Sequence, residues 1–527
     1  MFRRSLFKAG FSAGAASLLA APALAQDTRA TTLRFVPSAN LAVLDPIWTT
    51  ATITGTHGNF VFDTLYAMDE TMQPRPQMAE GHEVSADGLT WRFKLREGLK
   101  FHDGEPVRAV DCIASLQRWC AREPFGQLLM KAADSWRAID DRSFEIKLTR
   151  PFLPMLEALG KGDTSMPFIM PERLAKTDPS KQVTEMVGSG PYRFIQSEFN
   201  SGAKVVYEKF DGYLPRAEAP SWAAGGKVAH FKRVEWIIIP DPATAAAALM
   251  NNEIDWWERP QVDLQPQLAR SRDIAMPITD TSGRLAIMRF NSSQPPFDDV
   301  RLRRAVRLAV DQAEYMQASR GDAKDLWKLC RSQWPAGSTY HQDAEALMPA
   351  SLDKARKALS DAGYAGQKAV IINPTDYPDI GPLGQVTFDL LKKIGFNVEL
   401  AESDWGTVIQ RRANRGPVEK GGWSVFHTTG TAAGLVNPAM SYTVRGNGQQ
   451  NWAGWWESPK AEALVQDWLD AKDKAGQEKA AHALDTLVME DAPTIPLGQF
   501  TGRTAHRKSI TGIVPGPFPY PWGVKRA

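Results

Sequence analysis

The side chains best suited to catalysis in this sequence are eight histidines, and their spacing favours binding over chemistry. They lie at positions 57, 82, 102, 230, 341, 427, 482 and 506, none at metal-ligand spacing from another His or Cys. His102 and Asp103 could form an acid–base pair, but they lie in a glycine-containing turn. The sequence also has no G-x-S-x-G elbow, no Walker loop and no G-x-G-x-x-G turn. We therefore predict a binding protein rather than an enzyme, with no metal and no cofactor.

Polar and aromatic side chains follow four predicted strands, and we expect them to bind a ligand. In doubly wound sheets a ligand lies beyond the carboxyl ends of the strands. Tyr377 and Trp405 could contact such a ligand or pack in a core, and His427 could be a strand-end histidine held by a hydrogen bond. The candidate residues at the four strand ends are Asn40, Leu41, Thr375, Asp376, Tyr377, Asp404, Trp405, His427, Thr428 and Thr429.

The second half of the chain must position most of these residues, and its pattern alternates helix and strand. Asp298 and Asp299 cap a helix whose apolar residues recur at 302, 305, 306, 309 and 310, which is one stripe. Four arginines on its other faces, at 301, 303, 304 and 307, are expected to be solvated. Further helices are predicted over 351–362, 383–394 and 407–414, and strands over 369–373, 396–401 and 423–427. This order predicts a doubly wound α/β lobe.

The first half is richer in short strands and turns. Trp91, Phe93 and Leu95 alternate with polar residues directly after a turn at Asp87-Gly88, which predicts half of a hairpin with one buried face. Further strands are predicted over 143–148, 234–239 and 285–290. No repeat or low-complexity linker separates the two halves, so we expect short crossings between lobes.

Three cysteines, at 112, 120 and 330, are too few for a disulfide framework. Cys112 and Cys120 lie on one predicted helix, where eight residues span about 12 Å, beyond the reach of a disulfide. We expect all three to be buried, unpaired thiols.

The first 25 residues predict export. Arg3 and Arg4 precede an Ala- and Gly-rich apolar run that is too short to span a membrane, and an Ala-x-Ala site ends at Ala25. The arginine pair resembles a twin-arginine export signal. No later stretch of 18 apolar residues follows. We therefore expect the protein to act outside the cytoplasm, in a bacterial periplasm.

Composition narrows the class further. The 527 residues include 62 Lys and Arg against 60 Asp and Glu, and 43% are apolar, which excludes a disordered polyelectrolyte. Such a balance gives no reason to expect nucleic-acid binding. The length predicts about three structural units. The count of 17 Trp is high, because large flat rings are costly to expose unless they pack or bind something.

Several sequence blocks resemble the extracytoplasmic solute-binding proteins of ATP-driven importers, family 5, whose members include dipeptide, oligopeptide, nickel and haem binders. The longest block runs from Pro76 to Gly104 and contains Asp87-Gly88-Leu-Thr-Trp91. The other blocks are Gly188–Tyr192 with Phe210–Tyr213, Asp241 with Ala248–Asp255, and Asn291 with Pro296–Arg301. They span nearly the whole chain in the family order.

This resemblance implies a type II periplasmic binding protein fold of cluster C, with two α/β lobes and a hinged ligand cleft. It implies a signal peptide over 1–25, a first lobe over 26–280 with an extra subdomain at about 60–190, a second lobe over 281–494, and a return to the first lobe over 495–527. The expected partners are a small solute and, transiently, an inner-membrane ABC permease; we expect a monomer. An exported hydrolase or a peptide-handling chaperone on the same scaffold is the alternative.

One block departs from the peptide binders of the family. After Thr429 those proteins carry an acidic run, including the aspartate that pairs with a peptide ammonium group, whereas this chain has Gly430-Thr-Ala-Ala-Gly434-Leu-Val-Asn437-Pro438. A buried ammonium group without a partner is costly. Asp376 or Asp404 could substitute, or Arg445 and His427 could favour an anionic ligand. The solute could be a modified peptide, an opine, a glycoside or another nutrient.

Overall fold

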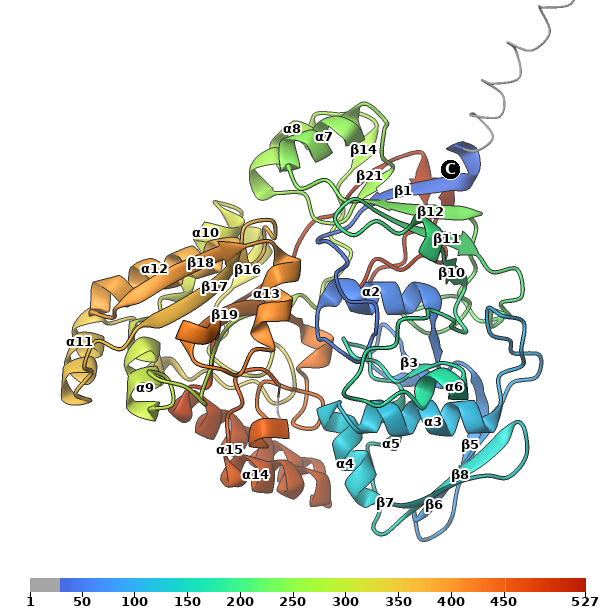
Figure 1. Cartoon of the computed structure of the whole chain (residues 1–527), viewed down its shortest axis with the longest axis horizontal. Helices are drawn as coiled ribbons and strands as arrows, with labels where there is room; N and C mark the ends of the chain where they lie inside the picture. Colours follow the sequence, from blue (N-terminus) through green and yellow to red (C-terminus); the bar gives the residue numbers. More distant parts are fainter. Residues whose placement is uncertain (1–28, 451) are drawn as a thin grey trace, which may run out of the picture.

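The computed structural model describes residues 29–450 and 452–527, which form two lobes, each built on its own sheet (Figure 1). The predicted signal peptide lies outside the described residues. The sheet of the first lobe has seven strands in the order β10-β11-β12-β1-β13-β21-β14. Their bounds are β1 Thr32–Val36, β10 Tyr192–Phe194, β11 Lys204–Lys209, β12 Arg233–Ile237, β13 Trp256–Trp257, β14 Ile274–Ala275 and β21 Ala505–Arg507.

Neighbouring residues of β1 face opposite sides of this sheet, as the two-residue period of a strand requires. Phe35 packs with α2 (Thr52–Val61) in the main core, whereas Val36 packs with α7 (Pro242–Met250) and α8 (Gln265–Ala269) on the other side. The last part of the chain returns to this lobe, because β21 pairs with β13 and β14. A small ribbon of β22 (Ile510–Thr511) and β23 (Lys525–Arg526) follows.

An additional four-stranded antiparallel sheet, in the order β5-β6-β8-β7, forms a subdomain of the first lobe. The predicted strand is β6 (Thr90–Leu95), with Phe93 and Leu95 buried. Cys112 and Cys120 lie on α3 (Ala109–Cys120), and both are buried and unpaired as expected, as is Cys330. The remaining bounds in this region are β2 Asp63–Thr64, β3 Tyr66–Met68, β4 Pro74–Pro76, β5 Ala79–Val84, α4 Pro124–Ala132, β7 Ala133–Ala138, β8 Ser143–Leu148, α5 Met155–Leu159, β9 Phe168–Ile169 and α6 Glu172–Ala175.

The second lobe contains the predicted alternation of helices and strands around a mixed six-stranded sheet, in the order β16-β20-β15-β19-β17-β18. Strand β17 pairs in parallel with β18 and β19, whereas β15 pairs antiparallel with β19 and β20. The bounds are β15 Arg284–Phe290, α9 Val300–Ala309, α10 Gln312–Arg320, β16 Trp327–Lys328, α11 Leu352–Asp361, β17 Ala369–Pro374, α12 Gly381–Ile394, β18 Val398–Ser403, α13 Trp405–Arg412, β19 Val425–Thr431 and β20 Thr494–Phe500.

The two faces of this sheet have different neighbours. Ile371 packs in a core with α9 to α12, whereas the next residue, Ile372, belongs to the core that continues into the first lobe. Phe426 of β19 lies in that shared core with Trp405 and Val408 of α13. The second sheet therefore turns one face toward its own helices and the other toward the first lobe.

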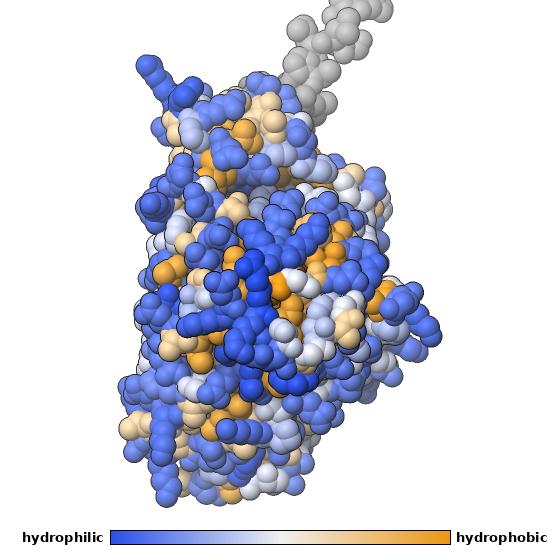
Figure 2. Space-filling view, turned by 90° about the vertical axis from the view of Figure 1, so that its left-hand side faces the viewer, coloured by the Kyte–Doolittle hydropathy of each residue, from blue (hydrophilic) through white to orange (hydrophobic). Residues whose placement is uncertain are grey.

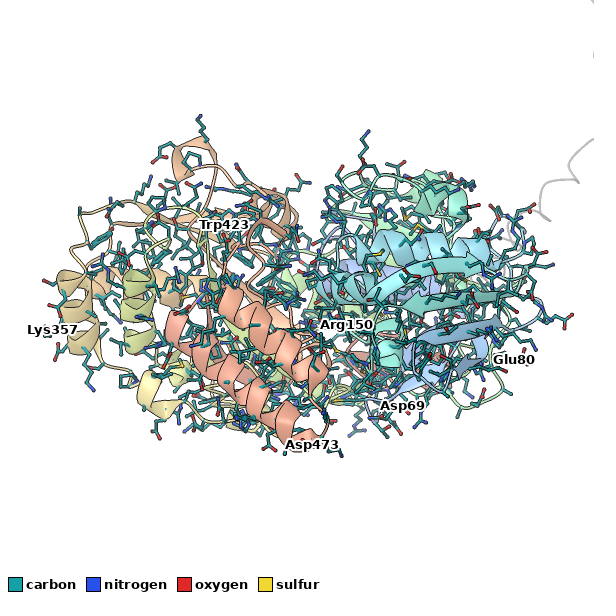
Figure 3. All side chains as sticks on the ribbon, turned by 90° about the horizontal axis from the view of Figure 1, so that it is seen from below. Asp69, Glu80, Arg150, Lys357, Trp423 and Asp473 are labelled. Carbon is teal, nitrogen blue, oxygen red and sulfur yellow. The ribbon has the colours of Figure 1, made fainter. Side chains whose placement is uncertain are left out.

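Helices α14 (Pro459–Asp470) and α15 (Lys474–Asp491) form a pair at the base of the second lobe. Figure 3 shows Arg150 of the first lobe at the boundary beside these helices, where it donates to Gln466 at 2.8 Å. The four arginines of α9 are not all solvated as the sequence predicted. Arg303 and Arg307 are buried and donate to backbone carbonyls at the end of α15.

The outer face of the second lobe is mostly hydrophilic, with apolar side chains scattered in several places (Figure 2). Within the described residues, no helix combines the length and the apolar character that crossing a membrane requires.

Candidate functional site

The two lobes meet where residues 49–52, which lead into α2 of the first lobe, approach α13 and the start of β15 of the second (Figure 1). Arg284 donates to the hydroxyl of Thr52 at 2.8 Å, and Arg412 donates to the hydroxyl of Thr49 at 3.2 Å. Trp452 donates its indole N–H to Thr50 at 3.0 Å. All three bonds join one lobe to the other, so the structure has the lobes closed on each other.

A first cavity of about 760 Å³ lies between the lobes. The first lobe contributes Ser38, Arg259 and, from the C-terminal return, Phe518; the second lobe contributes Tyr377 and Arg320. Among its described lining residues, carboxylates outnumber guanidinium groups by six to four. The carboxylates are Glu258, Asp263, Asp280, Asp376, Asp379 and Glu402, and the guanidinium groups are Arg259, Arg284, Arg320 and Arg503.

A second cavity of about 380 Å³ has the opposite charge. Four cationic side chains and one carboxylate lie among its described lining residues: Arg122, Lys161, Arg412, Arg415 and Glu123. Three tryptophan rings also line it, together with Thr49, Thr50 and Tyr442; these rings are Trp48, Trp452 and Trp455. Both lobes contribute to this cavity as well.

The predicted stretch Thr375–Tyr377 lines the first cavity. The ring of Tyr377 stacks on that of Trp405 with 5.1 Å between centroids, and its hydroxyl accepts from Arg259 of the other lobe at 3.3 Å. Trp405 is buried behind Tyr377 and is not among the residues lining either cavity. Asp376 accepts the backbone N–H of Trp405 at 2.7 Å, and burial raises the pKa of its carboxyl.

Two other predicted residues hold the loops near the cleft. Asp404 accepts the backbone N–H of Thr407 at 3.0 Å as the N-cap of α13, and hydrogen bonding to Thr407 lowers the pKa of Asp404. Asn40 accepts the N–H of Gly202 at 2.8 Å. Leu41 is fully buried in the main core.

The predicted residues of β19 are buried. His427 pairs with the hydroxyl of Thr387 at 2.7 Å inside the second lobe, and burial lowers its pKa to about 3. The hydroxyl of Thr429 accepts from Arg284 at 3.1 Å, which places this strand end beside the first cavity. Thr428 is also buried. His427 and Thr428 are not among the residues that line the two cavities.

Arg445 forms an ion pair with Glu462 at 2.7 Å and donates to the carbonyl oxygen of Pro124 in the first lobe at 2.9 Å. Its side chain is fully buried, and Arg445 is not among the described residues that line the two cavities. Arg445 thus joins the lobes at a point outside both cavities.

The turn after β19 receives a carboxylate from the first lobe. Asp163 is buried and accepts from the hydroxyl of Thr431 at 2.8 Å. A Cβ on Gly434 would lie 2.2 Å from a carboxylate oxygen of Asp163, so only glycine allows this approach. Asp163 was not predicted from the sequence. It lies far from β19 along the chain, in a loop that contains Gly and Ser but no recognisable motif.

Arg284 and Arg412 were not predicted from the sequence either. Arg284 begins β15, and a polar residue at the end of an apolar strand is ordinary. Arg412 ends α13, where a basic residue interacts favourably with the helix dipole. Burial lowers the pKa of both guanidinium groups, that of Arg412 to about 10. Neither position carries a sequence signal that distinguishes it from a surface arginine.

Comparisons with known proteins agree with this architecture. The sequence profile described as "Bacterial extracellular solute-binding proteins, family 5 Middle" matches residues 73–452. The probable peptide ABC transporter periplasmic-binding protein y4tO of Sinorhizobium fredii is 37% identical over 536 residues, which cover 100% of this chain and 99% of that relative. The glutathione-binding protein GsiB of Escherichia coli K12 is 26% identical, and the match covers 90% of each chain.

Two solved structures share the fold. The periplasmic binding protein AgaA of A. tumefaciens R10, in complex with agropinic acid, has a TM-score of 0.78 at 21% identity and covers 94% of this chain and 99% of its own. DppA of Helicobacter pylori, in complex with the peptide STSA, has a TM-score of 0.79 at 21% identity and covers 95% and 99%. The two-lobed fold predicted from the sequence is therefore confirmed.

Proposed function

Because this chain belongs to family 5 of the bacterial extracellular solute-binding proteins, we propose that the two cavities between its lobes hold the solute that it delivers to an ABC importer. Its fold is the type II, cluster C fold of periplasmic binding proteins. The peptide, glutathione and opine named for its relatives and structural neighbours indicate a small organic solute.

The observation that carries the proposal is that each cavity takes polar side chains from both lobes. Arg259 and Ser38 of the first lobe and Tyr377 of the second line the first cavity, and Thr49 of the first lobe and Arg412 of the second line the second cavity. A solute in either cavity touches both lobes only when they are closed, so it shifts the hinge equilibrium by its differential affinity for the closed state. An importer can then distinguish loaded from empty protein by shape.

The histidines considered for catalysis support a binding role. A general base needs a pKa near the working pH. Burial lowers the pKa of His102 to about 4 and that of His427 to about 3, and each ring is held by a structural hydrogen bond. Among the described residues, no three His, Cys, Asp or Glu side chains gather as a metal site would need. We propose that the chain is a receptor and has no hydrolytic activity.

The proposal also covers the export of the chain, its oligomeric state and the residues that contact the solute. Relatives named as periplasmic proteins imply export, and we assign this to a twin-arginine-type signal over residues 1–25, cleaved near Ala25. The mature chain acts as a monomer that meets an inner-membrane permease only transiently. Of the strand-end residues, Thr375, Asp376 and Tyr377 face the first cavity and are the ones we propose to contact solute there.

The test is a ligand screen of the mature chain, residues 26–527, by thermal unfolding against peptides, opines, glycosides and organic acids. A true solute at 100 times its Kd should stabilise the protein by about 2.7 kcal/mol and raise Tm. Tyr377→Ala should weaken binding at least tenfold. Tyr364→Ala, in the same lobe but away from both cavities, should bind as wild type.

Two results would contradict the proposal. One is a chain that no member of these classes stabilises. The other is turnover of a bound compound that stops when His102 or His427 is replaced, which would favour the hydrolase alternative.

A further inference from the structure

The second cavity indicates the chemical class of the solute. Resting on the function proposed above, we propose that the solute carries an oxyanion, a carboxylate or a phosphate ester, which binds to the guanidinium of Arg412 in this cavity. Arg412 is only 6% exposed, and it donates to two hydroxyls, that of Thr49 at 3.2 Å and that of Thr50 at 3.4 Å. Within the described part of the chain no carboxylate pairs with it.

Three of the other buried arginines of this protein pair with carboxylates. Arg118 pairs with Asp45 at 2.6 Å, and Arg445 pairs with Glu462 at 2.7 Å. Arg320 pairs with Asp379. A buried charge without a partner costs free energy, so a chain keeps one only where something compensates it. The guanidinium of Arg412 lies over the rings of Phe426 and Trp452, at 5.2 and 5.7 Å from their centroids, and these rings offset part of its charge. An oxyanion of the solute would supply the counter-charge that the rings do not.

Buried arginines can also be satisfied by backbone carbonyls, and this separates Arg412 from Arg289. Arg289 donates to the carbonyl oxygens of Ala453 and Thr443 and to the hydroxyl of Thr494. These bonds fix the loop behind the cavity. Among residues 29–450 and 452–527 no carbonyl oxygen accepts from Arg412, and Arg412 lines the cavity itself. Its guanidinium is therefore available to a ligand.

The surroundings of Tyr442 locate the positive potential. The charges that act on its buried hydroxyl are those of Asp163 and of three arginines, Arg284, Arg412 and Arg289. Arg284, which lines the first cavity, likewise has no carboxylate partner: it donates to Thr52 and Thr429, and within the described residues its buried Nη1 has no hydrogen-bond partner. The potential at the inner end of the second cavity is thus positive.

The rim of the cavity does not neutralise this charge. Its single carboxylate, Glu123, is paired with Lys161 at 3.7 Å, and Arg122 and Arg415 add two further positive charges. The first cavity has an excess of carboxylates, so an anionic group is repelled there and attracted to the second cavity. An oxyanion suits Arg412 because a planar guanidinium binds such groups through two parallel hydrogen bonds.

The side chains that line the second cavity indicate the chemical character of the part of the solute next to the oxyanion. Trp48, Trp452 and Trp455 line it, and Arg122 stacks over Trp48 at 4.4 Å. Flat rings favour a planar or apolar group of matching size. We therefore expect an organic acid or phosphate ester with an apolar or ring-bearing segment beside its charge.

The test compares acids with their neutral amides. C-terminally free peptides and the matching peptide amides, together with aromatic carboxylic acids and their amides, are titrated while tryptophan fluorescence reports occupancy. We expect each acid that binds to do so at least about tenfold more tightly than its amide, because charge-assisted hydrogen bonds are the strong ones. An acid and an amide of equal affinity would overturn the proposal.

Arg412→Gln provides the second arm, with Arg411→Gln as the matched control. Arg411 is the preceding residue of α13 and donates to the carbonyls of Gly421 and Gly422. It is not among the described residues that line the two cavities. We expect Arg412→Gln to lose the preference for the acid while Tm without ligand stays the same or rises, since an uncompensated buried charge is removed. Arg411→Gln should keep wild-type affinity.

Two further results separate a binding role from a structural one. Arg412→Lys keeps the charge and should recover part of the preference for the acid. If Arg412→Gln unfolds, the wild-type comparison of acid with amide still decides the matter. A chain that binds neutral solutes and ignores acids overturns this inference alone; a chain that binds nothing overturns the proposed function.

Discussion

Buried arginines in this protein differ in what compensates each charge, and besides those held by backbone carbonyls two groups stand apart. Arg118, Arg320 and Arg445 meet carboxylates, whereas Arg284 and Arg412, both at the boundary of the lobes, meet only hydroxyls and one backbone carbonyl. The first group holds the fold together. The second group leaves positive charge where a solute is enclosed.

Asp485 is a buried carboxyl whose protonation should affect stability. It lies on α15, accepts from the hydroxyl of Ser332 at 2.7 Å and the N–H of Gln333 at 2.8 Å, and burial raises its pKa to about 6. In the unfolded chain the pKa is about 3.9. The folded form therefore holds the proton more tightly, so this contribution to stability is full below about pH 4 and is lost as the pH rises through about 6.

Asp485→Asn should remove this dependence. We expect the stability of wild type relative to this variant to fall by about 3 kcal/mol between pH 4 and pH 7, and to stay level above pH 7. Thermal unfolding midpoints at unit steps of pH measure the difference. Glu490→Gln, at an exposed position of the same helix, should show no such trend. A constant difference between wild type and Asp485→Asn would show that the carboxyl stays ionised in the fold.

At the scale of elements, the C-terminus of α15 explains why two arginines of α9 are buried. Arg307 of α9 donates to the carbonyls of Leu347 at 2.9 Å and Glu490 at 3.0 Å, and Arg303 donates to that of Asp491 at 2.9 Å. The last carbonyls of a helix have no partners within it and carry partial negative charge. The arginines of α9 satisfy them and so join the two helices.

Arg307→Ala should therefore destabilise the second lobe by about 2 kcal/mol, because two or three carbonyls lose their donor. Arg301→Ala is the matched control on α9, since its side chain is 61% exposed, and its effect should stay within about 0.5 kcal/mol. Thermal unfolding of both variants measures the difference. Equal midpoints for the two variants would mean that water replaces the lost donor.

The periodic elements were predictable from sequence, and the non-periodic ones were not. The apolar stripe of α9 and the buried runs of β15 and β17 have lengths and periods that leave few alternatives. Helix α2 has no such stripe: it is buried all round and contains Thr54, His57 and Asn59. Its polar side chains are buried because distant parts of the first lobe surround it, among them Phe168, Tyr207 and Phe518, and that information is not local.

The candidate site shows the same limit. The residues at strand ends could be named because the topology of an α/β sheet places them at one edge, and Tyr377 lies in the first cavity. The roles of Arg412 and Asp163 depend on which charges come near them from elsewhere in the chain. A sequence records that a residue is an arginine, but it does not record the absence of a counter-charge.

At the scale of the whole molecule, Asp379 links the two lobes through ion pairs. It accepts from Arg320 of its own lobe and from Arg259 of the first lobe. Burial favours its neutral form, but the two guanidinium groups outweigh this effect and hold the pKa of Asp379 well below its usual range. The closed arrangement therefore contains an ion pair that opening must break.

Asp379→Asn should leave Arg320 without a counter-charge and Arg259 with Glu258 alone, and should destabilise the closed protein by about 3 kcal/mol. We expect a lower Tm, a larger radius of gyration in X-ray scattering without solute, and weaker solute binding. Asp361→Asn is the control, because Asp361 pairs with Lys357 on the exposed surface of α11. A variant at 379 with wild-type scattering and affinity would show that other contacts hold the lobes closed.

The three thiols have a practical consequence for observing this motion. Cys112, Cys120 and Cys330 are buried, and burial raises the pKa of each well above that of a free thiol, so none presents a thiolate to a reagent at neutral pH. A cysteine introduced at Lys357, on the far side of the second lobe (Figure 3), would be the single reactive thiol. Both described ends of the chain lie in the first lobe, because β1 and β21 share its sheet. A dye at 357 and a fluorescent protein fused to the C-terminus would thus report lobe closure by energy transfer, and the natural cysteines can stay in place.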